Sequence, residues 1–118
     1  MAEINIKLPW PPSVNRYWRN VKGRTLISAE GRAYKKAVAG LVMAKGLAGA
    51  FSGDDRLEVA IAAHVPDKRR RDLDNLLKAS LDAITEAIGV DDSQIDDLRI
   101  VRAEKMEGGE LALTIGIC

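Results

Sequence analysis

The residues with the clearest chemical potential are two aspartates, Asp72 and Asp74, at the predicted start of a helix. They directly follow four consecutive basic residues, Lys68, Arg69, Arg70 and Arg71. Two carboxylates spaced i, i+2 where an extended segment becomes a helix can approach one point and offer the hard oxygen ligands that Mg²⁺ prefers. Either aspartate could instead cap the helix, a role worth about 1 kcal/mol. Two capping candidates for one helix end still leave one carboxylate unexplained.

A lysine and a second acidic cluster could complete such a site. Lys78 lies four residues after Asp74, so both side chains would project from the same face of a helix. The two side chains could form a surface ion pair. Alternatively, Lys78 could be a cation beside metal ligands, where its charge could offset that of a phosphate. Past the helix, Asp91 and Asp92 begin an acidic run that could supply a third carboxylate. Aspartate-rich turns are also common without a metal.

Basic side chains gather in the first two thirds of the chain, although the formal net charge is only +1. Residues 1–80 contain 15 Lys and Arg against 8 Asp and Glu, whereas residues 81–118 contain 3 against 9. A basic run is most often a solvated surface, but it can also bind nucleic acid by neutralising phosphates. The candidates for this role are the run 68–71 and the basic residues of the segment 9–27, Arg16, Arg19, Lys22 and Arg24.

Several other chemistries are excluded by residue spacing. Calcium-loop, phosphate-cradling glycine, zinc-helix and nucleophile-elbow motifs are absent. The single histidine, His64, falls on a predicted strand and is expected to be structural. A single cysteine, Cys118, permits no internal disulfide and indicates a reducing compartment. Without a signal-peptide pattern or a run near the ~18 apolar residues of a membrane span, we expect a soluble cytoplasmic protein with no membrane partner and no organic cofactor.

The hydrophobic pattern predicts a single α+β domain over residues 1–118, with two helices and a mixed sheet of about four strands in the order β-α-β-α-β-β. Strands are expected at Glu3–Leu8, Leu57–Val65, Ile95–Lys105 and Glu110–Ile117. A turn at residues 107–109 would join the last two. The proline-rich segment 9–27 is expected to be a long loop, and loops of that length inside a domain are usually functional.

Two helices are expected from apolar residues spaced three and four apart. The first would start after Ser28, a good N-cap, and run to about Lys45. Its predicted inward stripe is Ala33, Ala37, Val38, Leu41 and Val42. The second, Asp72–Ile88, would be stopped by Gly89.

Four segments of the chain together resemble the RusA family of Holliday-junction resolvases. They are Leu8-Pro-Trp-Pro-Pro-Ser-Val-Asn15-Arg16-Tyr17, Ser28-Ala-Glu-Gly31, Pro66-Asp-Lys-Arg-Arg-Arg-Asp72-Leu-Asp74-Asn75-Leu with Lys78, and Asp91-Asp92-Ser-Gln. They occur in the family's order and at nearly its spacing, and the similarity extends over about residues 4–115. The C-terminal strand pair matches in pattern more than in identity.

The resemblance implies an endodeoxyribonuclease of bacterial or prophage origin that acts in DNA recombination and repair. Such an enzyme would bind four-way junction DNA as a homodimer and nick two strands symmetrically with Mg²⁺, for which Mn²⁺ would substitute. On matching positions, Asp72, Asp74 and Asp92 would form the catalytic, metal-binding triad, with Asp91 as the alternative third ligand. Lys78 would be the essential lysine. Asn15 matches a family segment near the active site and would contact DNA there.

Two other functions fit the same residues. A non-catalytic protein that binds branched DNA would use its aspartates only as helix caps, so that neutralising Asp72 or Asp74 would leave its function intact. A nuclease of the same fold that acts on another branched DNA or on RNA would differ in its choice of substrate. It would not share a preference for four-way junctions.

Overall fold

A four-stranded mixed sheet organises the fold, with the strand order β1-β6-β4-β5. The structure is a computed structural model that describes residues 3–118. The strands are β1 (Glu3–Pro9), β4 (Leu57–His64), β5 (Ile95–Ala103) and β6 (Glu110–Ile117). Strand β6 pairs antiparallel with both β1 and β4, whereas β4 and β5 are parallel. Parallel neighbours need a crossover connection, and the chain between β4 and β5 supplies one that contains a helix.

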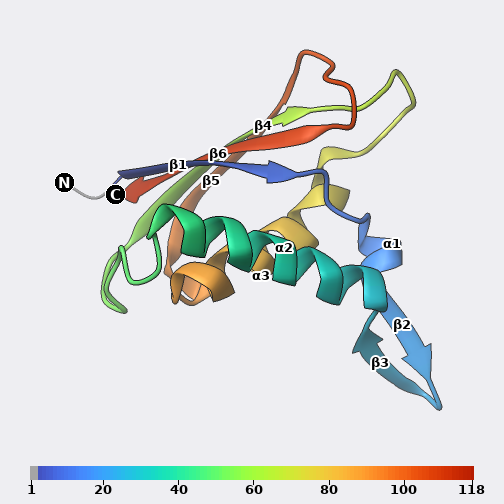
Figure 1. Cartoon of the computed structure of the whole chain (residues 1–118), viewed down its shortest axis with the longest axis horizontal. Helices are drawn as coiled ribbons and strands as arrows, with labels where there is room; N and C mark the ends of the chain where they lie inside the picture. The colour runs from blue at the N-terminus through green and yellow to red at the C-terminus, as the bar shows by residue number, and fades with distance from the viewer. Residues whose placement is uncertain (1–2) are drawn as a thin grey trace.

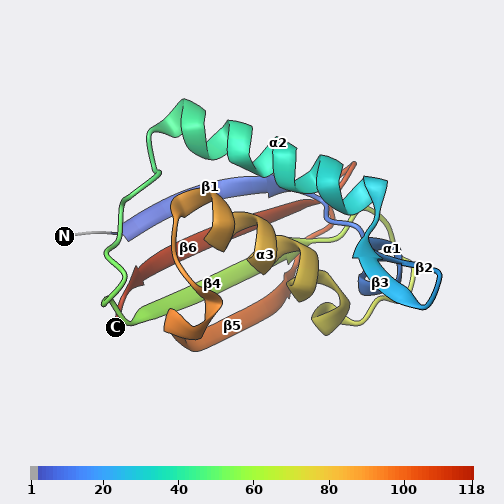
Figure 2. The ribbon, with the colours of Figure 1, turned by 90° about the horizontal axis from the view of Figure 1, so that it is seen from below.

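Helices α2 (Ala29–Lys45) and α3 (Leu77–Ile88) lie side by side on one face of this sheet (Figure 1 and Figure 2). Helix α2 begins after Ser28, whose hydroxyl accepts a hydrogen bond from the Gly31 amide at 3.0 Å. The 3₁₀ turn η1 (Leu73–Leu76) leads into α3, which ends at Gly89 in the left-handed conformation. These elements confirm the predicted α+β fold.

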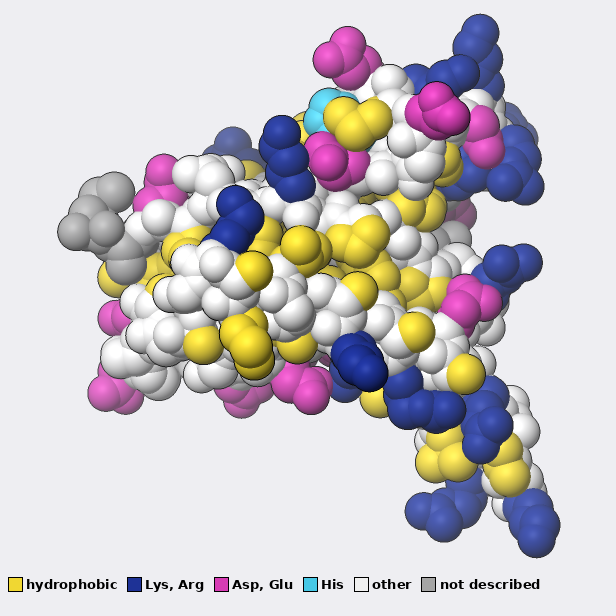
Figure 3. Space-filling model, viewed as in Figure 1, with side chains coloured by type: hydrophobic (Ala, Val, Ile, Leu, Met, Phe, Trp, Pro, Cys, Tyr) yellow, Lys and Arg dark blue, Asp and Glu magenta, His cyan; other side chains and the backbone are white. Residues whose placement is uncertain are grey.

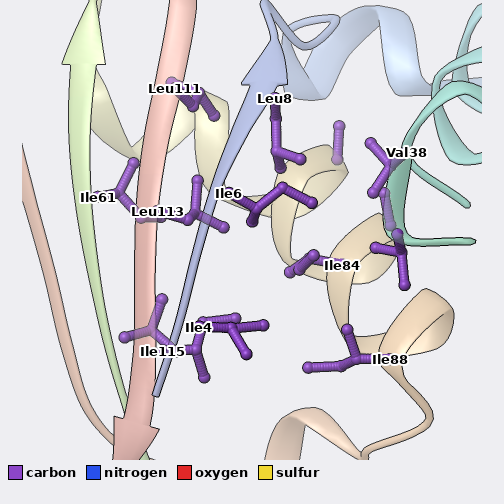
Figure 4. Packing of buried hydrophobic residues seen from close by; sticks show 14 of the residues in the cluster. Ile4, Ile6, Leu8, Val38, Ile61, Ile84, Ile88, Leu111, Leu113 and Ile115 are labelled. Atoms are coloured by element: carbon purple, nitrogen blue, oxygen red, sulfur yellow. The ribbon is translucent and has the colours of Figure 1, made fainter. Parts of the chain in front are cut away.

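The hydrophobic core lies between the sheet and the two helices (Figure 4). The alternation of β1 buries Ile4, Ile6 and Leu8, which lie opposite Ile115, Leu113 and Leu111 of β6. The helices contribute Val38, Ile84 and Ile88, all essentially inaccessible to solvent. Full burial of such a side chain stabilises the fold by about 1.5–3 kcal/mol. Helix α3 is therefore held firmly on the sheet, and the polar residues at its two ends have fixed positions.

The segment 9–27 is not the long loop that the sequence suggested. It contains a short helix, α1 (Val14–Tyr17), and a hairpin of strands β2 (Trp18–Val21) and β3 (Arg24–Ile27). The two residues between the strands have positive φ angles, 51° at Lys22 and 76° at Gly23. Two such residues form the tight turn whose twist matches that of a hairpin, and Gly23 was the one sequence cue for it, because glycine adopts positive φ without strain.

Two smaller expectations need correction. The predicted helix over 72–88 starts as the separate 3₁₀ turn η1, so α3 itself begins only at Leu77. Helix α2 buries Tyr34 in place of Ala33 and Ala37, which are exposed. Strands β5 and β6 follow one another in the chain, yet β4 lies between them in the sheet. Within residues 3–118, no helix has the length and apolar character needed to cross a membrane.

Candidate active site

Asp72 and Asp74 lie at the start of η1 with exposed, unpartnered carboxylates. Asp72 occupies the N-cap position in an extended conformation, but its side chain makes no capping hydrogen bond. Within residues 3–118, neither carboxylate takes part in a side-chain hydrogen bond or an ion pair. Neither aspartate therefore fills the structural role of a cap, and both are free to bind a ligand.

A surface cavity of about 490 Å³ brings one of these aspartates together with other polar residues. Asp72 lines it with Asn15 of α1, Asn75 of η1 and the two arginines Arg70 and Arg71. Segments far apart in the sequence thus meet here, because α1 lies beside the start of η1 (Figure 1). The cavity combines oxygen ligands for a cation with positive charge for a phosphate, as a phosphodiester-binding site requires.

The segment before Asp72 is fixed by ion pairs within the basic run. The Arg71 guanidinium donates to both carboxylate oxygens of Asp67, and the Arg69 amide donates to Asp67 at 2.9 Å. These hydrogen bonds, above all those from Arg71, hold the pKa of Asp67 well below its usual range. Arg71 also lies over the Trp10 ring, with its guanidinium carbon 5.8 Å from the ring centroid. Arg71 is therefore partly occupied in holding the chain that presents Asp72.

Lys78 is held by residues other than Asp74. Its ammonium lies 3.3 Å from a carboxylate oxygen of Asp82 and 5.4 Å from the centroid of the Trp18 ring. The same Asp82 oxygen accepts a hydrogen bond from the buried Tyr17 hydroxyl at 2.9 Å. Of the two alternatives for Lys78, the ion pair with Asp74 is not formed, because the Lys78 ammonium pairs with Asp82 and lies over the Trp18 ring.

Burial, together with the hydrogen bond to Asp82, raises the pKa of Tyr17, so this hydroxyl remains a donor at neutral pH. We expect Tyr17→Phe to lower the free energy of unfolding by about 1 kcal/mol, measured by urea denaturation. Tyr34→Phe is the matched control, since the Tyr34 hydroxyl donates to the Pro9 carbonyl at 2.7 Å and not to Asp82. Both variants should be destabilised alike, and only Tyr17→Phe should also slow the nuclease reaction that the sequence resemblance implies. Equal cleavage by the two would show that Tyr17 does not position Lys78.

Asp91 and Asp92 lie beyond the opposite end of α3. Asp91 precedes the short turn η2 (Asp92–Gln94) and completes a capping box with Ser93 and Gln94. Hydrogen bonds with Asp92 and Ser93 lower the pKa of Asp91. Asp91 thus has a structural role, whereas Asp92 is exposed and takes part in no ion pair within residues 3–118. Of the two, Asp92 is the better placed to bind an external ligand.

The three aspartates of the predicted triad do not meet within one chain. Helix α3 has 12 residues and is about 18 Å long at 1.5 Å per residue, and it separates Asp72 and Asp74 from Asp92. Across the described part of the chain, no three His, Cys, Asp or Glu side chains lie close enough together to hold a metal ion. Asp92 instead lines a second surface hollow with Lys35, Asp82 and Glu86.

The basic residues predicted to contact DNA lie at the same end of the molecule as Asp72. Arg16 shares a groove with Arg69, Arg70 and Arg71, and the other basic residues of this segment, Arg19, Lys22 and Arg24, are exposed on the β2–β3 hairpin. Figure 3 shows Lys and Arg side chains covering this projecting hairpin and the corner above it. The basic residues of segments 9–27 and 68–71 are thus concentrated at one end of the molecule.

Comparison with known proteins decides the family. The family model described as "Endodeoxyribonuclease RusA" matches residues 9–117. The chain belongs to the RusA family. It is 49% identical over 116 residues to "Crossover junction endodeoxyribonuclease rusA" of Enterobacteria phage 82, an alignment that covers 98% of this chain and 95% of that protein. It is 47% identical, with the same coverage, to the proteins named "Crossover junction endodeoxyribonuclease RusA" of Escherichia coli strain K12 and Shigella sonnei strain Ss046.

Membership of the RusA family confirms the resemblance and the enzyme class, an endodeoxyribonuclease. The structure adds positioning residues that the sequence did not single out. Trp10 and Asp67 hold Arg71, while Tyr17 and Asp82 hold Lys78. One signal was available, because Asp82 lies four residues after Lys78 and such pairs meet on a helix. Asp67 and Arg71 are also four residues apart, whereas the contacts of Trp10 with Arg71 and of Tyr17 with Asp82 join residues far apart in the sequence and could be seen only in the fold.

The basic run of this RusA-family chain divides into paired and free cations. Arg69 and Arg71 pair with Asp67, whereas Lys68 and Arg70 are exposed and pair with no acidic group in residues 3–118. We expect Lys68→Ala and Arg70→Ala each to weaken DNA binding and to lower the slope of log affinity against log salt by about 1. Lys45→Ala, at the far end of α2, is the control. An unchanged slope in both variants would place the run outside the DNA interface.

Proposed function

We propose that this chain is a Mg²⁺-dependent Holliday-junction resolvase that works as a homodimer and nicks two strands of a four-way junction symmetrically. The observation that carries the proposal is the pair of unpartnered carboxylates, Asp72 and Asp74, at the end of the molecule that bears the exposed basic residues. The names of the relatives, crossover junction endodeoxyribonucleases, support the substrate class.

The residues at the start of η1 fit a divalent cation of the Mg²⁺ type. Asp72 and Asp74 offer carboxylate oxygens with no competing cation bonded to them, and Mg²⁺ is usually bound through one or two carboxylates together with waters and substrate phosphate. Mn²⁺ accepts the same oxygen ligands. When bound, the ion supplies positive charge that stabilises the transition state of phosphodiester hydrolysis. Asp72 and Asp74 would hold it, and Asn15 lies in the same cavity, where it would orient the DNA backbone.

A dimer explains how Asp92 contributes to this site. Because α3, about 18 Å long, lies between Asp92 and the other two aspartates and the three carboxylates do not gather within residues 3–118, a shared site requires Asp92 of the partner subunit. A two-fold axis, the commonest oligomer symmetry, would then create two equivalent sites. Each site would combine Asp72 and Asp74 of one subunit with the partner's Asp92. Two sites related by two-fold symmetry match a substrate that is itself nearly two-fold symmetric and must be cut twice.

The basic residues would bind the DNA backbone without reading sequence. Phosphate contacts fix register and orientation, whereas sequence is read on the base edges. Arg70 lines the cavity that contains Asp72. Lys68 lines a second hollow with Arg70 and Asp72, and Arg16 lines a groove with Arg70. Lys78 would add a fixed positive charge near the reacting phosphate, because Asp82 and Trp18 restrict where its ammonium can lie.

The proposal is tested by the choice of substrate. Purified protein should cut an end-labelled four-way junction in Mg²⁺, should leave a linear duplex of the same arm sequences intact, and should cut neither in EDTA. A flap of the same sequences serves as the third substrate. Equal cutting of the junction, the flap and the duplex would refute resolvase activity in favour of a broader nuclease. Junction binding without cutting would favour the non-catalytic DNA-binding alternative.

A further inference from the structure

The β2–β3 hairpin forms an arm that extends away from the body of the molecule (Figure 1). Only its base is anchored, where Trp18 and Ile27 pack against the core. The eight residues 19–26 are all exposed. Two-stranded hairpins are at best marginally stable by themselves in water. Contact with a partner would therefore stabilise the outer half of this arm.

The arm has two chemically different faces, because cross-strand partners and alternate residues share a face of a hairpin. On one face Trp18 lies opposite Ile27, and Asn20 lies opposite Thr25. The Thr25 hydroxyl donates to the Asn20 side chain at 3.1 Å. The outer polar groups of this face are therefore bonded to each other, and we call it the polar face.

The other face mixes cationic and aliphatic side chains. Arg19 lies opposite Leu26, and Val21 lies opposite Arg24. Val21 and Leu26 are each 36% exposed, although neither packs against the core. The two arginines form no ion pair within residues 3–118. We call these four residues the arm face. Val21 and Leu26 lie on one diagonal of this face, and the two unpaired arginines lie on the other.

The chemistry of the arm face indicates a nucleic-acid partner with accessible bases. No acidic residue occurs between Glu3 and Glu30, so the arm complements a polyanion. A two-stranded ribbon is narrow enough to enter a groove of DNA. Minor-groove-binding proteins that combine Arg or Lys contacts with exposed Leu, Ile or Met side chains insert the apolar group between base steps and pay the energy of unstacking them. Stacking is interrupted at the branch point of a four-way junction and continuous along a linear duplex.

We propose that the arm face contacts the branch point of the junction, with Val21 and Leu26 against exposed base surfaces and Arg19 and Arg24 on the flanking phosphates. The inference rests on the proposed function and identifies the part of the chain that distinguishes branched from linear DNA. The cleavage site at Asp72 and the branch-contacting arm are then separate parts of one DNA-binding surface. They are joined through α1, which lies between them.

The test compares the double variant Val21→Ser/Leu26→Ser with Asn20→Ala/Thr25→Ala on the polar face. Affinity is measured at one salt concentration for a four-way junction carrying 2-aminopurine next to the branch, and for a linear duplex of the same length. We expect the arm-face variant to lose roughly tenfold in junction affinity, as one lost base contact implies. The affinity of the arm-face variant for the duplex should be unchanged, as should both affinities of the polar-face variant. The rise in 2-aminopurine fluorescence on binding should also disappear.

A second variant tests the arginines and guards against a misfolded arm. Arg19→Gln/Arg24→Gln should reduce the salt slope of junction binding by about 2 while the aliphatic pair remains. An unchanged ratio of junction to duplex affinity in the aliphatic variant would overturn the inference, as would an equal loss for both DNAs. Conversion of a dimer to a monomer in sedimentation would also overturn it, since the face would then bind a second copy of the chain. Wild-type preference for the junction tests the proposed function separately.

Discussion

Asp74→Asn is expected to abolish cleavage of a four-way junction while leaving junction binding intact. The substitution keeps the size of the side chain and removes the charge that would hold a divalent cation. Because the Asp74 carboxylate makes no hydrogen bond or ion pair within residues 3–118, the change removes no contact that holds the fold. Loss of metal-based stabilisation worth several kcal/mol corresponds to a rate decrease on the order of 10³-fold or more.

The matched control for this experiment is Asp54→Asn. Asp54 is exposed in the loop before β4, and its carboxylate is likewise unpartnered in residues 3–118. This variant should cleave like the wild type, whereas Asp72→Asn and Asp92→Asn should each behave like Asp74→Asn. Binding is measured by gel shift in EDTA and cleavage by single-turnover kinetics in Mg²⁺. Normal cleavage by Asp74→Asn would refute the metal-ligand assignment, and loss of binding in all three variants would indicate a folding role.

Mixing two inactive variants is expected to restore activity. Asp74→Asn and Asp92→Asn are inactive alone because each has lost one ligand from both sites of its dimer. In a mixed dimer, one site combines both substitutions and the other contains neither, if the partner subunit supplies Asp92. Random mixing at equal amounts gives about half mixed dimers, so about one quarter of all sites should be intact. These dimers should nick one strand and not two.

The outcome separates a shared site from a site within one chain. The two proteins are unfolded and refolded together, or co-expressed with different tags, so that the subunits exchange. If Asp92 served the Asp72–Asp74 pair of its own chain, every site in every dimer would be defective and the mixture would stay inactive. The control mixture combines Asp74→Asn with Asp72→Asn, two positions that the same subunit contributes to a site. It should remain inactive in either case.

Much of the fold follows from local patterns in the sequence. The alternation of Ile4, Ile6 and Leu8 predicts a half-buried strand, and Ser28 and Gly89 mark the helix ends found in the structure. These signals are reliable because they depend on backbone geometry and burial within a few residues. The strand order does not follow from local patterns, since β4 pairs with β5 and β6 through contacts between segments far apart in the sequence.

The hairpin at 18–27 and the inward face of α2 show where local reasoning fails. Three prolines in the segment 9–27 led to the prediction of a loop. The positive φ angles of Lys22 and Gly23 instead form the turn of a hairpin. Tyr34 replaces alanine on the buried face because its hydroxyl reaches the Pro9 carbonyl, a partner 25 residues away. A side chain with an apolar ring and a polar tip can be buried when such a partner exists, and the sequence does not reveal the partner.

The candidate site residues were named from the sequence, but the sequence did not show which of them lie together. Asp72 and Asn15 share a cavity, as the resemblance implied. Lys78 turns to Asp82 instead of Asp74, because the choice between two neighbours depends on Tyr17 and Trp18. The separation of Asp72 from Asp92 was predictable, since a helix of about 12 residues, roughly 18 Å long, lies between them in the chain.

Cleavage of a supercoiled plasmid that extrudes a cruciform tests the central claim most directly. A resolvase with two equivalent metal sites cuts both strands during one binding event and yields linear plasmid, because a single nick relaxes the plasmid and removes the cruciform. We predict linear product from the wild type in Mg²⁺, none in EDTA and none from Asp74→Asn. Nicked circles alone, or binding to the cruciform without cleavage in Mg²⁺, would contradict the account.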